Sequence, residues 1–403
     1  MARMTGKERM LTALSGGVPD RVPVAPDFSC MIPCRLTGKP FWDVLLYQNP
    51  SIWKAYIDAC DKFGTEAWVI YGDLHPQGVS PVTWSSHIEK ENGRVKLYGR
   101  CHTEAGELTR TETFFPADAS TWTEKIIKDL KDDMPKLRCL YSAIQSYSLE
   151  QIRELEAEVG DRGIWGVSIA TPGLQYWMNY FEGSLEAATF AMLDEPELFG
   201  ELCRLLEKQQ EQLVEICCQE KVESILTGGS GSITLQSPSI WRELCLPAIQ
   251  KQTKMCRQAG VLSGIHSCGK EKYIVETCAR ETDLDYINPL EIPPMGDCHL
   301  AECRRLAGGK LALMGNLHTT QVMLMGDTDT VRLASLRAIR DAGQDGSFVL
   351  STGDQCGRDT PDENIIEMVR VAEEFGHYPL NMDRICSEIE RLERKLENVE
   401  PKP

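Results

Sequence analysis

Short apolar runs alternate with longer stretches of helical periodicity along most of the chain. The runs that predict strands lie at residues 21–25, 67–71, 164–170, 224–227, 261–266, 286–290, 311–315 and 347–351. Helix signals separate them: Ser237-Pro238 and Gly260 delimit one helix, and Asp327 and Gly343 delimit another. Strands that alternate with helices indicate an α/β fold with a parallel sheet, and eight such units close a (β/α)8 TIM barrel.

Two segments depart from this alternation. Residues 87–115 alternate polar and β-favouring positions, with turn signals at 90–94 and 105–107. We expect an antiparallel β-hairpin there, inserted into the barrel at about residues 85–116. Near the end of the chain, Ile385, Ile389, Leu392 and Leu396 recur at helical spacing. They predict a C-terminal amphipathic helix at about 380–400, packed on the body of a single domain spanning 1–403 or on a second copy in a homodimer.

The charge of the chain restricts its partners. The 60 acidic residues exceed the 43 basic ones and give a net charge of -17. Such a chain repels nucleic-acid phosphates and anionic membrane surfaces, so we expect neither as a partner. A leader of the charged-then-apolar type is not evident, and no apolar run approaches the ~20 residues that span a bilayer. We therefore expect a cytoplasmic protein whose 16 cysteines are reduced thiols.

The most informative local pattern is His266-Ser267-Cys268, at the end of a predicted strand. A His and a Cys two positions apart on extended chain point to the same face. A second thiol, Cys356, follows the last predicted strand. One imidazole and two thiolates form a favoured ligand set for zinc that leaves one position open. The two segments are strand-to-helix junctions, where α/β barrels gather their catalytic groups.

Short motifs distributed over nearly the whole chain resemble landmarks of the uroporphyrinogen decarboxylase superfamily, in the same order. They are residues 19–24 (PDRVPV), 69–74 (VIYGDL), 180–183 (YFEG), 237–239 (SPS) with 246–247 (LP), 315–317 (GNL) and 360–364 (TPDEN). Each motif is weakly specific by itself, but six in register are a fairly strong signal. The resemblance implies a (β/α)8 barrel whose site lies at the C-terminal ends of the strands.

The chain departs from the decarboxylases of that superfamily where their chemistry occurs. Their arginine-rich segment after the first strand is replaced here by residues 27–32 (DFSCMI). Asp73 matches their pocket aspartate and is a candidate proton-handling group, whereas Asp354 replaces their histidine near the last strand. Decarboxylation of uroporphyrinogen is therefore the weaker interpretation, and a metal-independent decarboxylase that uses Asp73 on a smaller carboxylate stays an alternative.

The His-x-Cys pattern instead resembles the cobamide-dependent methyltransferase branch, which binds zinc. His266 and Cys268 match its motif. Counting back from Thr360 places Asp354 at the position of the third ligand, while Cys356 lies two residues on and would need a local shift. Ligand softness favours Cys356, with Asp354 as the alternative. Glu291, after another predicted strand, is a candidate fourth ligand or proton relay.

The resemblance implies a zinc-dependent methyltransferase that uses a corrinoid. We expect the corrinoid (cobalamin) on a partner protein, because the chain lacks the Asp-x-His-x-x-Gly signature of a cobalamin-binding module. One direction of transfer removes a methyl group from a small methoxylated donor, as in an O-demethylase. The opposite direction methylates a thiol such as coenzyme M, and two thiolate ligands favour that direction. Aromatic residues near strand ends, such as Tyr71 and Trp177, favour a methoxylated aromatic substrate and hence the demethylating component.

Overall fold

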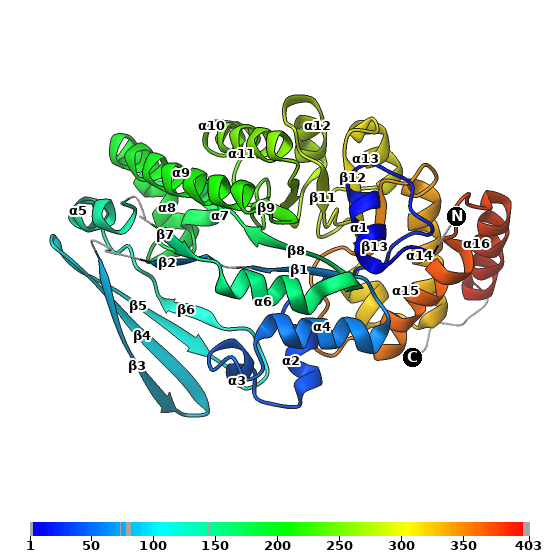
Figure 1. The fold of residues 1–403 in the computed structure, drawn as a ribbon, viewed down its shortest axis with the longest axis horizontal. Coiled ribbons are helices and arrows are strands. Elements are labelled where there is room, and N and C mark those ends of the chain that lie inside the picture. Colours follow the sequence, from blue (N-terminus) through cyan, green and yellow to red (C-terminus); the bar gives the residue numbers. More distant parts are fainter. Residues whose placement is uncertain (1–2, 73, 78–81, 143–145, 398–403) are drawn as a thin grey trace.

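A curled parallel sheet forms the centre of the molecule. The computed structural model describes residues 3–72, 74–77, 82–142 and 146–397 of the chain. Within these residues the sheet has seven strands in the order β1-β8-β9-β10-β11-β12-β13 (Figure 1). Its strands are β1 (Ala67–Gly72), β8 (Gly163–Ser168), β9 (Ser224–Gly228), β10 (Leu262–His266), β11 (Tyr286–Asn288), β12 (Ala312–Leu317) and β13 (Phe348–Thr352). This TIM-like arrangement confirms the α/β class.

The segment expected as the first of eight strands, residues 21–25, is not a strand in the structure. It forms only isolated bridges, one of them between Val24 and Leu350 of β13. Pro23 interrupts the segment, and a proline has no N–H to donate to a continuous ladder. The segment nevertheless links the two edges of the sheet. Leu350 N donates to Pro23 O at 2.9 Å on one side, and Glu66 N, just before β1, donates to Val24 O at 2.9 Å on the other.

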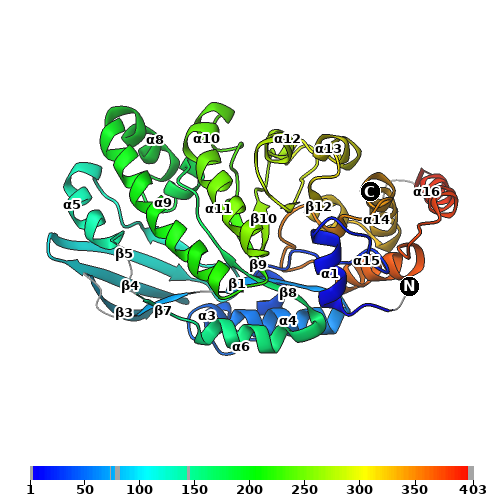
Figure 2. The same ribbon diagram turned by 45° about the horizontal axis from the view of Figure 1, so that its top comes forward.

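Helices cover the outside of the sheet (Figure 2). Helices α4 and α6 pack against β1, α6 also packs against β8, and α11 packs against β9 and β10. The described helices are α1 (Gly6–Leu14), α2 (Met31–Thr37), α3 (Phe41–Leu45), α4 (Ile52–Phe63), α5 (Leu130–Leu140), α6 (Glu150–Val159), η1 (Gly160–Arg162), α7 (Leu174–Trp177), α8 (Ser184–Asp194), α9 (Pro196–Gln219), α10 (Pro238–Leu244), α11 (Leu246–Ala259), α12 (Lys272–Glu281), α13 (Leu300–Ala307), η2 (Thr319–Leu324), α14 (Thr328–Ala342), α15 (Asp362–Phe375) and α16 (Met382–Glu397). None of these described helices is both long enough and apolar enough to cross a bilayer.

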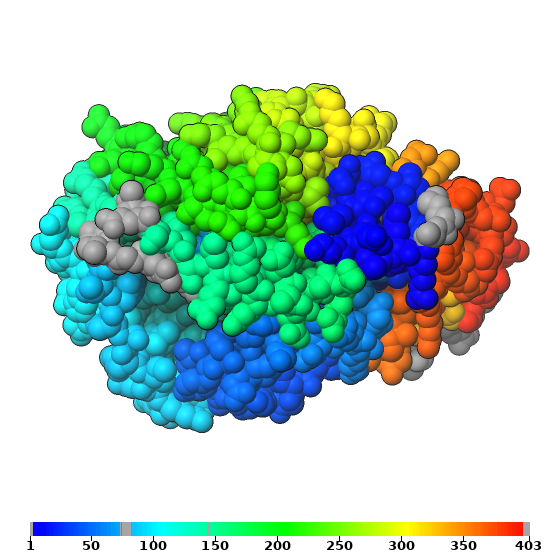
Figure 3. Space-filling model, viewed as in Figure 1, coloured from blue at the N-terminus to red at the C-terminus, as the bar shows by residue number. Residues whose placement is uncertain are grey.

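Large side chains fill the space enclosed by the sheet. The Tyr286 ring occupies the centre, where its hydroxyl hydrogen-bonds Ser224 Oγ at 3.1 Å and accepts from Trp68 Nε1 at 3.2 Å. Gly264 on β10 leaves room for that ring, because a Cβ there would lie 2.1 Å from Tyr286 Cζ. Helix α1 contributes Met10 and other apolar residues to the same core. Figure 3 shows this N-terminal segment (blue) at the surface, beside C-terminal elements (orange).

The antiparallel segment expected near 85–116 is larger than a hairpin. Strands β3 (Thr83–Glu91), β4 (Arg94–Thr103), β5 (Gly106–Phe114) and β6 (Thr121–Glu124) form a four-stranded sheet at one end of the molecule (Figure 1). Asn92 and Gly93 join β3 to β4 with φ values of 50° and 72°, as a tight primed turn requires. Two short strands, β2 (His75–Gln77) and β7 (Ser146–Ser148), pair separately.

The expected C-terminal helix is present as α16, and residues 398–400 of the expected range lie outside the described residues. Ile385, Ile389 and Leu392 are buried on one face of α16, and the helix packs against α14 of the same chain. Arg332 of α14 also pairs with Glu388 of α16 at 3.1 Å.

A buried ion network holds residues 21–25 against the beginning of β1. The Glu66 carboxylate accepts hydrogen bonds from Arg9 Nη1, Arg21 Nη2 and Val24 N, each at 2.7 Å. Arg9 also binds Asp20 at 2.6 Å. Glu66 and Arg9 are about 95% buried, with exposed fractions of 4% and 5%. Removal of one partner leaves the others as uncompensated buried charges, which is costly.

We therefore expect Glu66→Ala to lower the free energy of unfolding by about 3–5 kcal/mol, measured by urea denaturation. Glu220→Ala is the matched control, because Glu220 pairs with Arg153 at 2.7 Å on the exposed surface. That control should cost less than about 1 kcal/mol. Equal effects of the two variants would contradict the role assigned to Glu66.

Candidate metal centre

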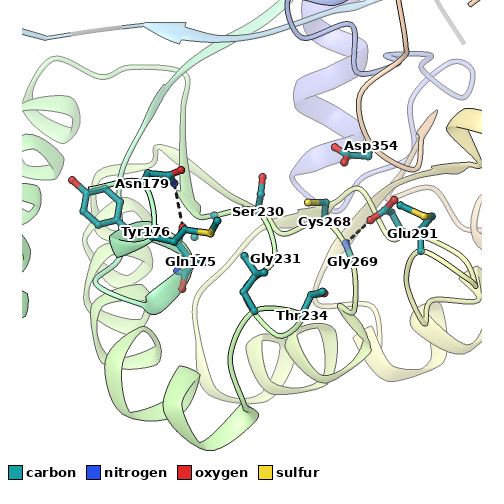
Figure 4. Close-up of a pocket in the computed structure, with 15 residues that line it drawn as sticks. Gln175, Tyr176, Asn179, Ser230, Gly231, Thr234, Cys268, Gly269, Glu291 and Asp354 are labelled. Carbon is teal, nitrogen blue, oxygen red and sulfur yellow. Dashed lines mark hydrogen bonds between the residues drawn. The ribbon is translucent and has the colours of Figure 1, made fainter. Parts of the chain in front are cut away.

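Three side chains that commonly bind metal ions converge where β10 and β13 end. His266 is the last residue of β10, Cys268 lies two positions later, and Asp354 follows β13 by two positions. One ligand atom of each residue lies within 4.8 Å of the others, and His266 Nε2 is 3.9 Å from Asp354 Oδ1. Figure 4 shows the Cys268 thiol and the Asp354 carboxylate on the same side of the pocket. The structure thus brings together His266, Cys268 and the alternative third ligand.

The parallel sheet explains this convergence. Parallel strands end at the same edge, so residues far apart in sequence reach one site. Two backbone hydrogen bonds fix the loops that carry the ligands: Ser267 N donates to Asn288 O at 3.0 Å, and Gly353 N donates to Leu317 O at 2.7 Å. The ligand-bearing segments are therefore held by neighbouring strands.

Cys356, the preferred third ligand in the sequence analysis, is not part of this group. Its side chain is fully buried, and its backbone N donates to Asp27 O at 2.8 Å. The expectation rested on an extended chain between residues 354 and 356. The backbone of Asp354 instead has a φ of 128°, so the alternation of side chains is broken there. Burial, and next the nearby carboxyl group of Asp27, raise the pKa of the Cys356 thiol to about 12.

The Cys268 thiol lies in surroundings that disfavour its anion without a cation. Burial, followed by the charges of Asp354 and Glu291, raises the pKa of Cys268 to about 12, while a hydrogen bond with Ser230 opposes the shift. A divalent cation among these groups would reverse the balance, because thiolates bind metals and thiols do not. The side chains at this site would therefore be more stable around a bound cation than without one.

Further carboxyl groups surround the cluster. Glu291 accepts a hydrogen bond from Gly269 N (Figure 4), and burial raises its pKa. Asp27 and Glu271 are buried, and burial is the main cause that raises the pKa of each carboxyl group. Asp73, the remaining candidate from the sequence, lies outside the described residues.

Several buried polar atoms next to the cluster have no hydrogen-bond partner among the described residues. They are His266 Nδ1, Ser267 Oγ and both side-chain polar atoms of Asn288. His266 and Asn288 are paired in register on β10 and β11. Buried polar groups in folded proteins are normally paired. This concentration of unpaired polar atoms at one strand edge is typical of a binding site.

Two adjoining cavities meet at the cluster. The first, of about 510 Å³, is lined by Cys268, Glu291 and Asp354 on one side and by Tyr176 and Asn179 on the other (Figure 4). The second, of about 640 Å³, includes His266, Asp354 and Asp27 in its walls and also reaches Tyr176. Both volumes are sufficient for a small organic ligand. The side chains that could bind a metal therefore face space for a substrate.

The aromatic residues in the cavity walls differ from those named from the sequence. Trp177 is fully buried in a hydrophobic cluster, and Tyr71 packs against Tyr56 with ring centroids 5.9 Å apart. Tyr176 and Tyr180 line the second cavity instead, with stacked rings 4.5 Å apart. Tyr176 lies in α7 and Tyr180 in the turn that follows it, and no sequence pattern distinguished them from the buried Trp177.

The donor set at the cluster fits zinc. One imidazole nitrogen, one thiolate sulfur and one carboxylate oxygen are all common zinc donors. The three residues are half-buried and face cavities, so a fourth position remains open to a ligand. Catalytic zinc sites combine three protein ligands with such an open position.

Comparisons with known proteins identify a matching family and solved structures with a similar fold. The family described as Uroporphyrinogen decarboxylase (URO-D) matches residues 123–375. A methyltransferase from Methanosarcina mazei has a similar structure, with a TM-score of 0.66 and 17% identity over 93% of this chain and 99% of that one. A B12-independent methionine synthase from Shewanella sp. W3-18-1 aligns over 94% and 100% of the two chains, at 11% identity and a TM-score of 0.39. No curated protein matches the chain.

The positive φ of Asp354 gives a testable consequence. An angle of 128° is tolerated by glycine and strained for other residues. We expect Asp354→Gly to raise the free energy of unfolding of the metal-free protein by about 1 kcal/mol, measured in urea with a chelator present. Asp354→Asn is the control, because it removes the charge and keeps the strain. If Asp354→Gly and Asp354→Asn raised the free energy of unfolding equally, the gain would come from the loss of charge and not from the relief of strain.

Proposed function

The chain belongs to the uroporphyrinogen decarboxylase family, and within this family we propose that it is a zinc-dependent methyltransferase. It would move a methyl group between a small methoxylated substrate and the cobalt of a corrinoid on a partner protein. The observation that carries the proposal is the convergence of His266, Cys268 and Asp354 on two adjoining cavities. A methyltransferase with the same fold, from Methanosarcina mazei, supports the reaction class.

The ligand set favours transfer of the methyl group from an ether to the corrinoid. His266, Cys268 and Asp354 would hold the zinc ion, which would supply Lewis-acid stabilisation of the charge that develops on an ether oxygen. With Asp354 in place of Cys356, the set contains one thiolate. One thiolate donates less electron density than two, so the bound cation stays a stronger acid. This favours demethylation of an ether over the alternative, methylation of a coenzyme M-like thiol.

Glu291 is suited to handle the proton. Its carboxyl group lines the same cavity as Cys268 and Asp354, and burial raises its pKa, which favours the protonated form. One oxygen accepts from Gly269 N, so the other is free to carry the proton. In demethylation the partner's corrinoid, as Co(I), would supply the electron pair that accepts the methyl group, and Glu291 would give its proton to the oxygen that is left when the O–CH3 bond breaks. The decarboxylase alternative depends on Asp73, and the described residues offer no observation that favours it.

Zinc content tests the proposal and its third ligand together. For protein purified anaerobically, we expect about one zinc ion per chain, lost in Cys268→Ala and in Asp354→Ala and kept in Cys356→Ala. Methyl transfer to a corrinoid protein, followed by the absorbance of cobalt, should be lost in the same two variants. Zinc lost from Cys268→Ala and Cys356→Ala but kept in Asp354→Ala would place the third ligand at Cys356, and wild-type protein without zinc would remove the proposal.

The affinity for zinc should rise with pH. Without metal, the pKa of Cys268 is about 12, so near neutral pH the thiol must release a proton when it binds zinc. Affinity should therefore increase about tenfold per pH unit, and weaken correspondingly as pH falls. Competition with a chelator between about pH 6 and 8 measures this slope. Cys268→Asp, whose carboxylate is already ionised, should show a shallower slope, and identical slopes would exclude Cys268 as a ligand.

A further inference from the structure

A third cavity adjoins the two at the metal centre. Its volume is about 270 Å³, and its walls include Arg110 and Trp122 of the antiparallel sheet. Tyr176 and Asn179 belong to this cavity and to the 510 Å³ cavity, and Tyr180 is shared with the 640 Å³ cavity. Residues of α7 and of the turn after it therefore form a wall that the cavity at Arg110 shares with the cavities at the metal centre.

Arg110 is a cation without an anionic partner among the described residues. Its guanidinium lies over the rings of Trp84 and Trp122, 4.3 Å and 4.7 Å from the two centroids. Burial is the main cause that lowers its pKa. Arg100 on the adjacent strand differs, because it is exposed and pairs with Glu107 at 3.2 Å. The carboxylate of Glu112, two positions along β5, raises the pKa of Arg110 by its charge but accepts from Ser120 Oγ at 2.6 Å and forms no ion pair with Arg110 among the described residues. The half-buried guanidinium can therefore still bind an anionic ligand.

The surrounding residues preserve the space around Arg110. Gly99 lies opposite Arg110 on β4, and a Cβ on Gly99 would lie 3.3 Å from Arg110 Cγ, so a larger residue would press on the arginine stem. The other cation in the cavity wall, Lys125, already donates to Met178 O at 2.6 Å. Arg110 is thus the cation in this cavity that is available to a ligand.

This inference rests on the proposed methyltransferase function. We infer that Arg110 binds a carboxylate of the methyl donor, while the flat body of the donor lies along Tyr176 and Tyr180 and its methoxy group reaches the metal centre. A guanidinium between two indole rings presents its N–H groups in one plane, which matches a carboxylate. The stacked tyrosines favour a planar, aromatic donor.

The overall charge makes such an anchor necessary. A chain with a net charge of -17 repels an anionic substrate at long range. The metal centre adds Asp27, Glu291 and Asp354 to the cavity walls. An anionic donor therefore needs a local cation at the end of the site away from these carboxyl groups, and Arg110 provides it.

A pair of probes that differ in charge tests the inference. Methoxybenzoate and methoxybenzamide have nearly the same shape, and calorimetric titration of each into the zinc-loaded protein compares their affinities. We expect wild-type protein to bind the acid at least about tenfold more tightly than the amide. Arg110→Gln should remove this preference by weakening the acid alone, and Arg100→Gln, the matched control, should keep it.

Equal affinities of wild-type protein for the acid and the amide would overturn the inference without any variant, so the test does not depend on the folding of Arg110→Gln. Unchanged binding of the acid by folded Arg110→Gln would also overturn it. Assaying methyl transfer with the same wild-type protein separates the two proposals. A preference that depends on Arg110 in a protein that transfers no methyl group would support the subsite and remove only the methyltransferase function. Methyl transfer by a protein that shows no preference for the acid would support the methyltransferase function and remove the Arg110 subsite.

Discussion

The buried carboxylate of Glu66 is the contact on which the barrel-like form of the sheet depends. It binds two arginines and the backbone of Val24, and so holds residues 21–25 between β13 and β1. Without this segment, β1 and β13 would be open edges of a seven-stranded sheet. With it, the strands curve around a common interior, and their C-terminal ends face one another. The metal-binding side chains can meet only because the strand ends converge in this way.

The charge distribution at that end of the sheet favours a bound cation. Asp27, Glu271, Glu291 and Asp354 are carboxyl groups near a single histidine, and burial raises the pKa of the first three. Such a concentration of acidic groups is stable either as neutral acids or as ligands around a positive ion. In the proposed function, the same groups would stabilise a bound metal and keep protons available for the reaction beside it.

The sequence predicted the parts of the fold that depend on local patterns. Apart from residues 21–25, the predicted strands were close to those observed, because apolar runs between turn signals are sufficient to define buried strands. Two helix ends were also correct: Asp327 accepts from Thr330 N as an N-cap, and Gly260 ends α11 with a φ of 71°. The helix expected between Ser237 and Gly260 is instead two helices, α10 and α11, with Pro247 near the start of the second.

Features that depend on three-dimensional context were not predictable. His266 and Cys268 were identified by their spacing, but the choice between Asp354 and Cys356 depended on one backbone angle that no sequence pattern encodes. Arg110 was missed because its importance comes from the cavity that it shares with the turn after α7, far away in sequence.

The antiparallel sheet has a consequence for how this protein diversifies. Strands β3, β4 and β5 precede residue 123, where the match to the family begins, whereas His266, Cys268 and Asp354 lie within the matched region. In the proposed function, the metal ligands and the tyrosines along the cavity lie within the matched region, whereas Arg110 lies outside it. If Arg110 has the proposed role, substitutions in the sheet would change which donor is accepted and leave the metal ligands in place. Related lineages could in this way acquire new substrates without evolving the reaction anew.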